Sequence, residues 1–274
     1  MAELPEVETI RRQLAEAVGG VPWESLDVRP GRIFHSPARQ IADRLKGAKL
    51  DAVERRGKAL VLVFDNGHAL LVHLGMSGQV LLVPPAEPSL GHRHLAVGLG
   101  DGRELVFRDP RKFGYLRLVR REEAAGTREL SGIGPDPLDP ALTWDKFTEM
   151  LKARGGRVKS LLIDQGLFAG VGNIYSDEIL YAARIHPARQ TTDLTPIELK
   201  ELYHAIRSVL SVAIGYGGTS FDEAFVDLYG RSGLYGGCLK VYGREREPCL
   251  KCSTPLKGTR IGGRTSVFCP HCQK

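Results

Sequence analysis

The sequence predicts a multi-domain α+β fold, with an N-terminal β-sandwich flanked by helices, a helical middle part and a small C-terminal module that holds four cysteines. Short apolar segments separated by turn residues fill residues 53–119, a pattern typical of antiparallel sandwiches. Helical periodicity dominates residues 141–214. Two Cys-x-x-Cys pairs follow between residues 249 and 272.

The first expected element is an amphipathic helix that begins almost at the amino terminus. Between Pro5 and Val18, apolar residues recur at helical spacing, while Arg11 and Arg12 face elsewhere. The apolar face consists of Val7, Ile10, Leu14 and Val18.

Two β-hairpins are the clearest strand signals. Residues 59–64 and 68–74 are apolar and flank Asp65-Asn66-Gly67, whose Asn-Gly pair is typical of tight hairpin turns. Residues 95–99 and 104–107 flank a Gly-Asp-Gly turn in the same way. We therefore expect antiparallel strands in this region.

The second half of the chain begins with a linker and continues with helices. Residues 132–140 contain three prolines and two glycines, which favours an interdomain connection. Thr195, Pro196 and Glu198 form a capped helix start, and this helix should run to about Ile214. The glycine-rich span 215–237 is too long for an ordinary connection and is a candidate mobile functional loop.

The cysteine spacing predicts a structural zinc site. Each Cys-x-x-Cys pair lets two thiolates converge on one ion, and two pairs complete a closed tetrahedron. The four predicted ligands are Cys249, Cys252, Cys269 and Cys272. Disulfides are the alternative, and His271 is a conceivable substitute ligand, although four thiolates suffice. Cys238 has no partner at ligand spacing and is expected to be a packed or free thiol.

Positive charge is concentrated in the same C-terminal module. The formal net charge of the chain is +6, and residues 240–274 contain eight basic and two acidic side chains. A compact basic module predicts a polyanion partner, most simply nucleic acid, with a solvated basic tail as the plainer alternative. No apolar stretch approaches the ~18 residues that span a bilayer, so we expect a cytoplasmic protein. For its oligomeric state, a monomer is the simplest expectation.

Two further motifs suit contact with DNA. In Gly170–Tyr175, two glycines precede Asn173 at a helix start, where exposed backbone N–H groups can hold a phosphate. Most such turns merely let helices pack closely. In Arg108–Gly114, basic and aromatic side chains share a tight turn and can wedge into a base stack. Taken alone, this motif would be better explained as an exposed charged hairpin tip.

Taken together, the motifs resemble those of formamidopyrimidine-DNA glycosylases. The matching segments are Glu3–Thr9, Arg55–Lys58, His73–Gly78, Asp109–Gly114, Gly170–Tyr175 and the terminal zinc finger, in the order found in that family. The similarity covers essentially the whole chain. The opening Glu-Leu-Pro-Glu favours this branch over the endonuclease eight-like glycosylases, which usually open with Glu-Gly-Pro-Glu.

The resemblance implies a base excision repair enzyme of a bacterial, nucleoid-associated kind. Such an enzyme removes 8-oxoguanine and formamidopyrimidines from duplex DNA and then cleaves the abasic strand by β,δ-elimination. It also implies one structural Zn²⁺ ion and a duplex with oxidised bases or abasic sites as the partner. The implied fold is a β-sandwich domain at 1–132, a linker at 133–140, a helix-two-turn-helix domain at 141–237 with a lesion-recognition loop near 218–237, and a zinc finger at 238–274.

Four catalytic residues are implied by the same resemblance. The nucleophile of the family is the amine at position 2, which removal of the initiator methionine exposes and which forms a Schiff base at sugar C1′; in this chain that residue is Ala2. Glu3 matches the acid/base that protonates the sugar ring oxygen. Lys58 matches the lysine that binds phosphate near the lesion and assists elimination. Arg264 matches the finger arginine assigned to δ-elimination.

The remaining matches concern DNA contact. The positions assigned to DNA binding are His92, Arg111, Arg154, Asn173 and Tyr175. The trio that fills the space left by the extruded nucleotide is Met76, Arg111 and Phe113.

The departure from the family pattern lies at position 2, where the family has proline and this chain has Ala2. A proline nitrogen gives a permanently charged iminium, whereas a primary amine gives an imine that must be protonated to withdraw electrons. We therefore expect weakened glycosylase and lyase activity. The alternative is a non-catalytic binder of lesion or abasic DNA, and a zinc-finger transcription regulator is a third hypothesis that leaves the glutamate-rich amino terminus unexplained.

Overall fold

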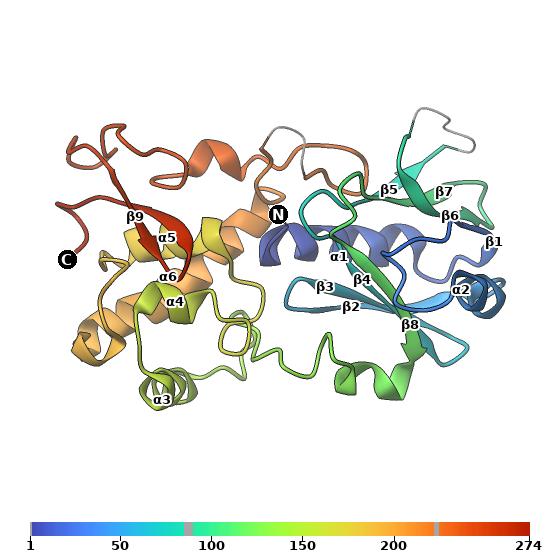
Figure 1. The fold of residues 1–274 in the computed structure, drawn as a ribbon, viewed down its shortest axis with the longest axis horizontal. Helices are drawn as coiled ribbons and strands as arrows, with labels where there is room; N and C mark the ends of the chain where they lie inside the picture. Colours follow the sequence, from blue (N-terminus) through green and yellow to red (C-terminus); the bar gives the residue numbers. More distant parts are fainter. Residues whose placement is uncertain (1, 85–89, 222–224) are drawn as a thin grey trace. The chain divides into compact units, whose positions relative to one another are not determined.

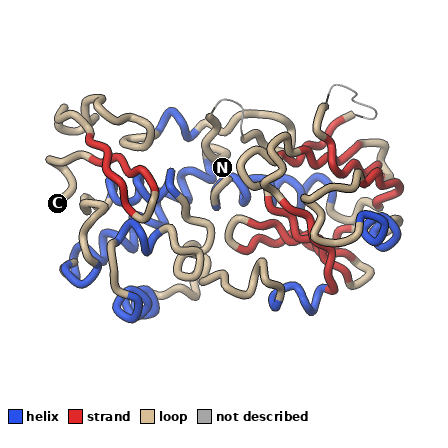
Figure 2. Tube along the Cα trace, viewed as in Figure 1, coloured by secondary structure: helices blue, strands red, loops and turns tan. Residues whose placement is uncertain are grey.

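The computed structural model describes residues 2–84, 90–221 and 225–274. Internal contacts divide the chain into two units, the first formed by Met1–Ser131 with Tyr216–Gly236 and the second by Gly132–Gly215 with Gly237–Lys274. Figure 1 labels the main helices and strands of both, and Figure 2 distinguishes helix from strand along the trace. Within the described parts of the chain, no helix is long and apolar enough to cross a bilayer.

The first unit contains two four-stranded antiparallel sheets, so the predicted sandwich is confirmed. The sheets have the strand orders β1-β6-β7-β5 and β2-β3-β4-β8. Its elements are α1 (Leu4–Val18), β1 (Trp23–Val28), α2 (Ala38–Leu45), β2 (Leu50–Arg56), β3 (Ala59–Phe64), β4 (His68–His73), β5 (Gln79–Val83), β6 (Arg93–Leu99), β7 (Glu104–Arg108), β8 (Tyr115–Arg120) and the 3-10 helix η1 (Arg121–Gly126).

Both predicted hairpins form, and they supply much of the core. Strands β3 and β4 pair with Val61 opposite Leu71, and β6 and β7 pair with Val97 opposite Leu105. Every residue of β3 is buried. Apolar side chains from both sheets and from α1 join one buried cluster, because alternate strand residues point to the shared interior.

The described residues of the glycine-rich segment after residue 215 belong to the first unit, whereas residues 222–224 of the predicted lesion-recognition loop lie outside the described residues. Phe225 and Leu228 belong to the buried cluster of the sandwich, and the Leu82 N–H donates to the Leu228 carbonyl at 2.8 Å. Sequence patterning grouped this segment with the preceding helices, whereas its contacts group it with residues 1–131. The predicted domain bounds remain predictions.

The second unit is helical and ends in a two-stranded hairpin. Its elements are α3 (Trp144–Arg154), α4 (Val158–Leu162), α5 (Asn173–Ala182), the 3-10 helix η2 (Thr191–Asp193), α6 (Pro196–Gly215), β9 (Lys257–Ile261) and β10 (Arg264–Phe268). A further 3-10 helix, η3 (Tyr235–Cys238), begins in the first unit and ends in the second. The predicted cap of α6 is present, since the Thr195 N–H donates to Glu198 Oε2 and the Glu198 N–H donates to Thr195 Oγ1.

Candidate functional site

The proposed nucleophile and acid/base lie at the buried start of α1. Ala2 and Glu3 are 7% and 1% exposed. Glu3 is the residue before the first helical turn, and its N–H donates to Glu6 Oε2 at 2.8 Å. This contact satisfies a backbone donor that the helix itself cannot pair, so it fixes the chain direction directly after Ala2.

Glu6 also holds the glycine-rich segment, a role that sequence patterning missed. Its second oxygen, Oε1, accepts a 2.7 Å hydrogen bond from the Thr219 N–H. Gly218 has a φ of +83°, and a Cβ at this position would lie 2.8 Å from Glu6 Oε1, so only glycine fits beside the carboxylate. The Glu-x-x-Glu spacing of a capping box was the available signal, but it does not reveal the distant partner.

The turn that carries Lys58 is held by a buried carboxylate on α1. The Arg55 guanidinium donates to Glu8 Oε2 at 3.0 Å and to the Gly57 carbonyl at 3.3 Å, directly before Lys58. Burial alone would raise the pKa of Glu8, but hydrogen bonds from three arginines outweigh it and hold that pKa at about 2. The three arginines are Arg11, Arg12 and Arg55.

Lys58 lies beside an uncharged histidine. Burial, together with the charge of Lys58, lowers the pKa of His73 to about 4. The Gly75 N–H donates to His73 Nδ1 at 3.0 Å, which requires an unprotonated nitrogen. The His73 ring also stacks on Tyr115, with centroids 5.2 Å apart. A neutral side chain therefore lines the strand end next to Lys58.

One fully buried aspartate builds the turn between β7 and β8. Asp109 Oδ1 accepts hydrogen bonds from the Ser77 hydroxyl at 2.6 Å and the Arg111 N–H at 3.2 Å. Its Oδ2 accepts from the Gly114 N–H at 2.8 Å. The Asp109 N–H donates to the carbonyl of His92, an exposed residue with a φ of 60°. Asp109 thus fixes the backbone around His92, Arg111 and Phe113.

The structure brings the three predicted void-filling residues onto adjoining loops. Met76 and Phe113 are 41% and 53% exposed, so both apolar side chains are accessible to a DNA partner. The Arg111 guanidinium lies 5.0 Å from the centroid of the Phe113 ring. A Cβ on Gly75 would lie 2.5 Å from the Phe113 backbone, so the Met76 loop touches the Phe113 loop where only glycine fits.

In the second unit, Asn173 is the first residue of α5 and already has a partner. Its Nδ2 donates to the Thr265 carbonyl at 3.0 Å, while its buried Oδ1 has no hydrogen-bond partner within the described residues. Tyr175 is fully buried, so the structure places its ring inside the unit. Its predicted DNA contact stays a prediction. Arg154, at the end of α3, is exposed and pairs with Asp164 at 3.2 Å.

The four predicted zinc ligands converge. Their sulfur atoms all lie within 4.8 Å of one another, with Cys252 3.5 Å from Cys269 and from Cys272. Tetrahedral zinc with bonds of ~2.3 Å places sulfurs ~3.8 Å apart, whereas a disulfide needs about 2 Å. The cluster therefore fits one structural zinc ion, and the disulfide alternative is wrong. Cys238 and His271 lie outside the cluster.

Arg264 opens strand β10, directly after the glycine turn of the finger hairpin. Gly262 and Gly263 both have positive φ, as a two-residue hairpin loop requires. Arg264 pairs with Ile261 across the hairpin, and its side chain is exposed. The next residue, Thr265, is the one that Asn173 holds. The finger arginine and the first residue of α5 are therefore neighbours in space.

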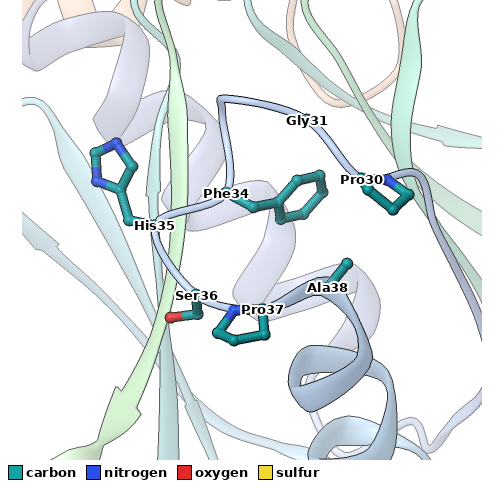
Figure 3. A pocket seen from close by; sticks show the side chains of 7 residues that line it. All are labelled: Pro30, Gly31, Phe34, His35, Ser36, Pro37 and Ala38. Atoms are coloured by element: carbon teal, nitrogen blue, oxygen red, sulfur yellow. The ribbon is translucent and has the colours of Figure 1, made fainter.

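None of the predicted site residues lines a surface cavity of about 420 Å³. Six residues of the loop between β1 and α2 line it together with Ala38, the first residue of α2. Figure 3 shows Phe34 and His35 extending in opposite directions from that loop. The predicted site residues, all of which the structure describes, lie elsewhere in the chain.

Three family models match successive parts of the chain. Residues 1–116 match the N-terminal domain of formamidopyrimidine-DNA glycosylase, and residues 133–224 match its H2TH domain. Residues 246–274 match the zinc finger found in FPG and IleRS.

Relatives match over nearly the full length. A formamidopyrimidine-DNA glycosylase from a Nocardioides species is 44% identical over all of this chain and 94% of its own. The MutM (FPG) protein of Thermus thermophilus is 38% identical, with a TM-score of 0.87 over 99% of this chain and 98% of its own. Lactococcus lactis Fpg, solved in complex with DNA containing an abasic site, is 32% identical, with a TM-score of 0.90 over the whole of both chains.

Proposed function

Since this chain belongs to the formamidopyrimidine-DNA glycosylase family, we propose that it removes oxidised purines from duplex DNA and cleaves the resulting abasic strand. The buried Ala2-Glu3 pair at the start of α1 carries the proposal, because a nucleophile and an acid/base must be adjacent and shielded from bulk water. Zinc has a structural role in this scheme: four thiolates leave no open position for substrate.

The chemistry begins at the nitrogen of Ala2 once Met1 has been removed. The amine attacks C1′ of the damaged nucleotide, the bond to the base breaks, and the base leaves with the bonding electrons and a proton. Glu3 protonates the ring oxygen, so the sugar opens to a Schiff base with the Ala2 nitrogen. Loss of a C2′ proton then expels the 3′ phosphate, and a second elimination expels the 5′ phosphate.

The other predicted residues are proposed to bind the DNA backbone or to fill the space left by the extruded nucleotide. Lys58 and Arg264 are proposed to hold phosphates during elimination, and the exposed Met76 and Phe113 to occupy the space of the extruded nucleotide. His92, Arg154 and Asn173 are the further proposed contacts to DNA. Lysine and arginine contacts release counterions, so binding should weaken steeply with salt.

Borohydride trapping on an 8-oxoguanine duplex tests the proposal. We expect the native chain to form a trapped protein–DNA adduct more slowly than Ala2→Pro, because its imine must first be protonated. Equal yields would refute the weakened step at Ala2. Lesion binding without adduct in either protein would favour the non-catalytic binder. Mass spectrometry of the amino terminus is the control, because retention of Met1 removes the reactive amine.

A further inference from the structure

Helix α5 presents three polar side chains to the zinc finger along one face. Asn173, Asp177 and Tyr181 follow at intervals of four residues, so they stack on one side of the helix. We call them the α5 stripe. Each contacts the finger module, and each contact lies within the second unit.

The first two members hold successive residues of strand β10. Asn173 Nδ2 donates to the Thr265 carbonyl at 3.0 Å. Asp177 Oδ1 accepts from the Ser266 hydroxyl at 2.5 Å, and Asp177 Oδ2 accepts from the Val267 N–H at 3.0 Å. These three residues immediately follow Arg264, so the strand is fixed one residue beyond the arginine.

The negative charge of the buried Asp177 is balanced by a buried lysine. Asp177 is 1% exposed and Lys159, on α4, is 0% exposed. Lys159 Nζ pairs with Asp177 Oδ1 and also donates to the Asn173 carbonyl at 3.4 Å. A buried carboxylate needs such a partner, and the Lys159 ammonium supplies it here.

The third member reaches the metal cluster. The Tyr181 hydroxyl lies 3.5 Å from Cys249 Sγ, and its ring packs against the small core of the finger. A zinc-bound thiolate has no proton, so Tyr181 must be the donor. Glu178, on the same helix, accepts hydrogen bonds from the backbone N–H groups of residues 240–242 and so anchors the start of the module.

From these contacts we propose that the α5 stripe is a positioning device for the finger, in which Tyr181 is an outer-sphere hydrogen-bond donor to the zinc ligand Cys249 and Asp177 fixes the strand that carries Arg264. The link to strand cleavage rests on the proposed function, whereas the contacts to the finger do not. Outer-sphere partners of this kind orient ligands and slow metal loss.

Tyr181→Phe tests the sulfur contact, because it keeps the packed ring and removes only the hydroxyl. We expect zinc transfer to a chelator to be about tenfold faster. In the cobalt-substituted protein, the sulfur-to-cobalt charge-transfer band should move to lower energy, because the sulfur donates more charge without its hydrogen bond. Tyr203→Phe is the matched control, since this variant also loses one hydroxyl hydrogen bond, to the Leu142 carbonyl, in the same unit. Unchanged zinc release and spectrum in Tyr181→Phe, or equal changes in Tyr203→Phe, would overturn the role of Tyr181.

Ser266→Ala tests the strand contact, because it removes the hydroxyl that donates to Asp177 and leaves the Lys159–Asp177 pair intact. Without DNA, hydrogen exchange should accelerate in residues 264–268 and stay unchanged in α3. On preformed abasic DNA, the ratio of δ- to β-elimination product should fall about twofold with unchanged adduct formation, the amount expected for ~0.4 kcal/mol. Unchanged exchange would overturn the positioning role. Faster exchange in a protein inactive on DNA would uphold that role and count against the proposed function alone.

Discussion

The Thr219 N–H donates a 2.7 Å hydrogen bond to Glu6 Oε1, across more than two hundred residues of sequence, while Glu6 Oε2 accepts from the Glu3 N–H. One buried carboxylate therefore joins the backbone beside the proposed nucleophile to the glycine-rich segment that the family resemblance assigns to lesion recognition. A displacement of the Glu6 carboxylate would change both hydrogen bonds, because one side chain accepts them.

Glu6→Gln should slow base excision more than strand cleavage. A glutamine has one acceptor oxygen, so it loses one of the two backbone contacts and turns an amide donor toward another donor. We expect about a tenfold lower single-turnover rate on an 8-oxoguanine duplex and less than twofold on preformed abasic DNA, which needs no base recognition.

The matched control for Glu6 is Glu16→Gln, an exposed glutamate on the same helix. Equal losses on both substrates would contradict a role in base recognition and point to general disruption of α1.

Asp109→Asn should destabilise the loop that carries Arg111 and Phe113. The Asp109 carboxylate accepts hydrogen bonds on both oxygens, from Ser77 and Arg111 on Oδ1 and from Gly114 on Oδ2. An amide has only one acceptor oxygen, so at least one buried donor is left unpaired. The expected cost is about 1–3 kcal/mol in the free energy of unfolding, with weaker binding to abasic duplex. Thermal unfolding and a binding titration measure the two effects. Asp101→Asn, in the exposed β6–β7 turn, is the control, and equal effects in both variants would exclude a special role for Asp109.

His73 should make the protein less stable in mild acid. Its pKa is about 4 in the folded chain against 6.5 as the ordinary value, so the unfolded chain binds more protons between these limits. Stability therefore falls as pH drops from 6.5 to 4, by up to about 3 kcal/mol. Glu8, with a pKa of about 2 against 4.5, adds a further loss only below pH 4.5.

Urea unfolding between pH 4.5 and 7 separates the histidine from the glutamate. His73→Gln should flatten the profile in this range, and His204→Gln, at an exposed histidine of α6, should leave it as in the native chain. A profile as steep in His73→Gln as in the native protein would show that another group titrates.

Metal analysis should find one zinc ion per chain. Cys269→Ser removes a thiolate of the cluster, so bound zinc should be lost together with DNA binding. Cys238→Ser should retain the full metal content, because Cys238 lies outside the cluster. Loss of zinc in Cys238→Ser would refute the ligand set.

The local elements were predictable because their signals are local. The Asn-Gly turn at residue 66 specifies the β3–β4 hairpin, Thr195 and Glu198 specify the start of α6, and Cys-x-x-Cys spacing specifies a metal site. The resemblance supplied the candidate residues one by one, but it did not supply their supports. Glu6, Asp109 and Asp177 were missed because an acidic residue in a sequence looks the same whether it is solvated or buried against backbone donors.

By itself, the sequence determined the sandwich, its helical and zinc-binding parts and the ligand set, which follow from residue spacing within short segments. The family and the departure at Ala2 came from the resemblance of its motifs to those of known glycosylases. Only the tertiary structure decided that Glu6 holds Thr219, that Phe225 and Leu228 pack in the core of the sandwich, and that the α5 stripe meets β10 and Cys249. Such contacts join residues far apart in the chain, and their partners are selected by packing and by the need to pair every buried polar group.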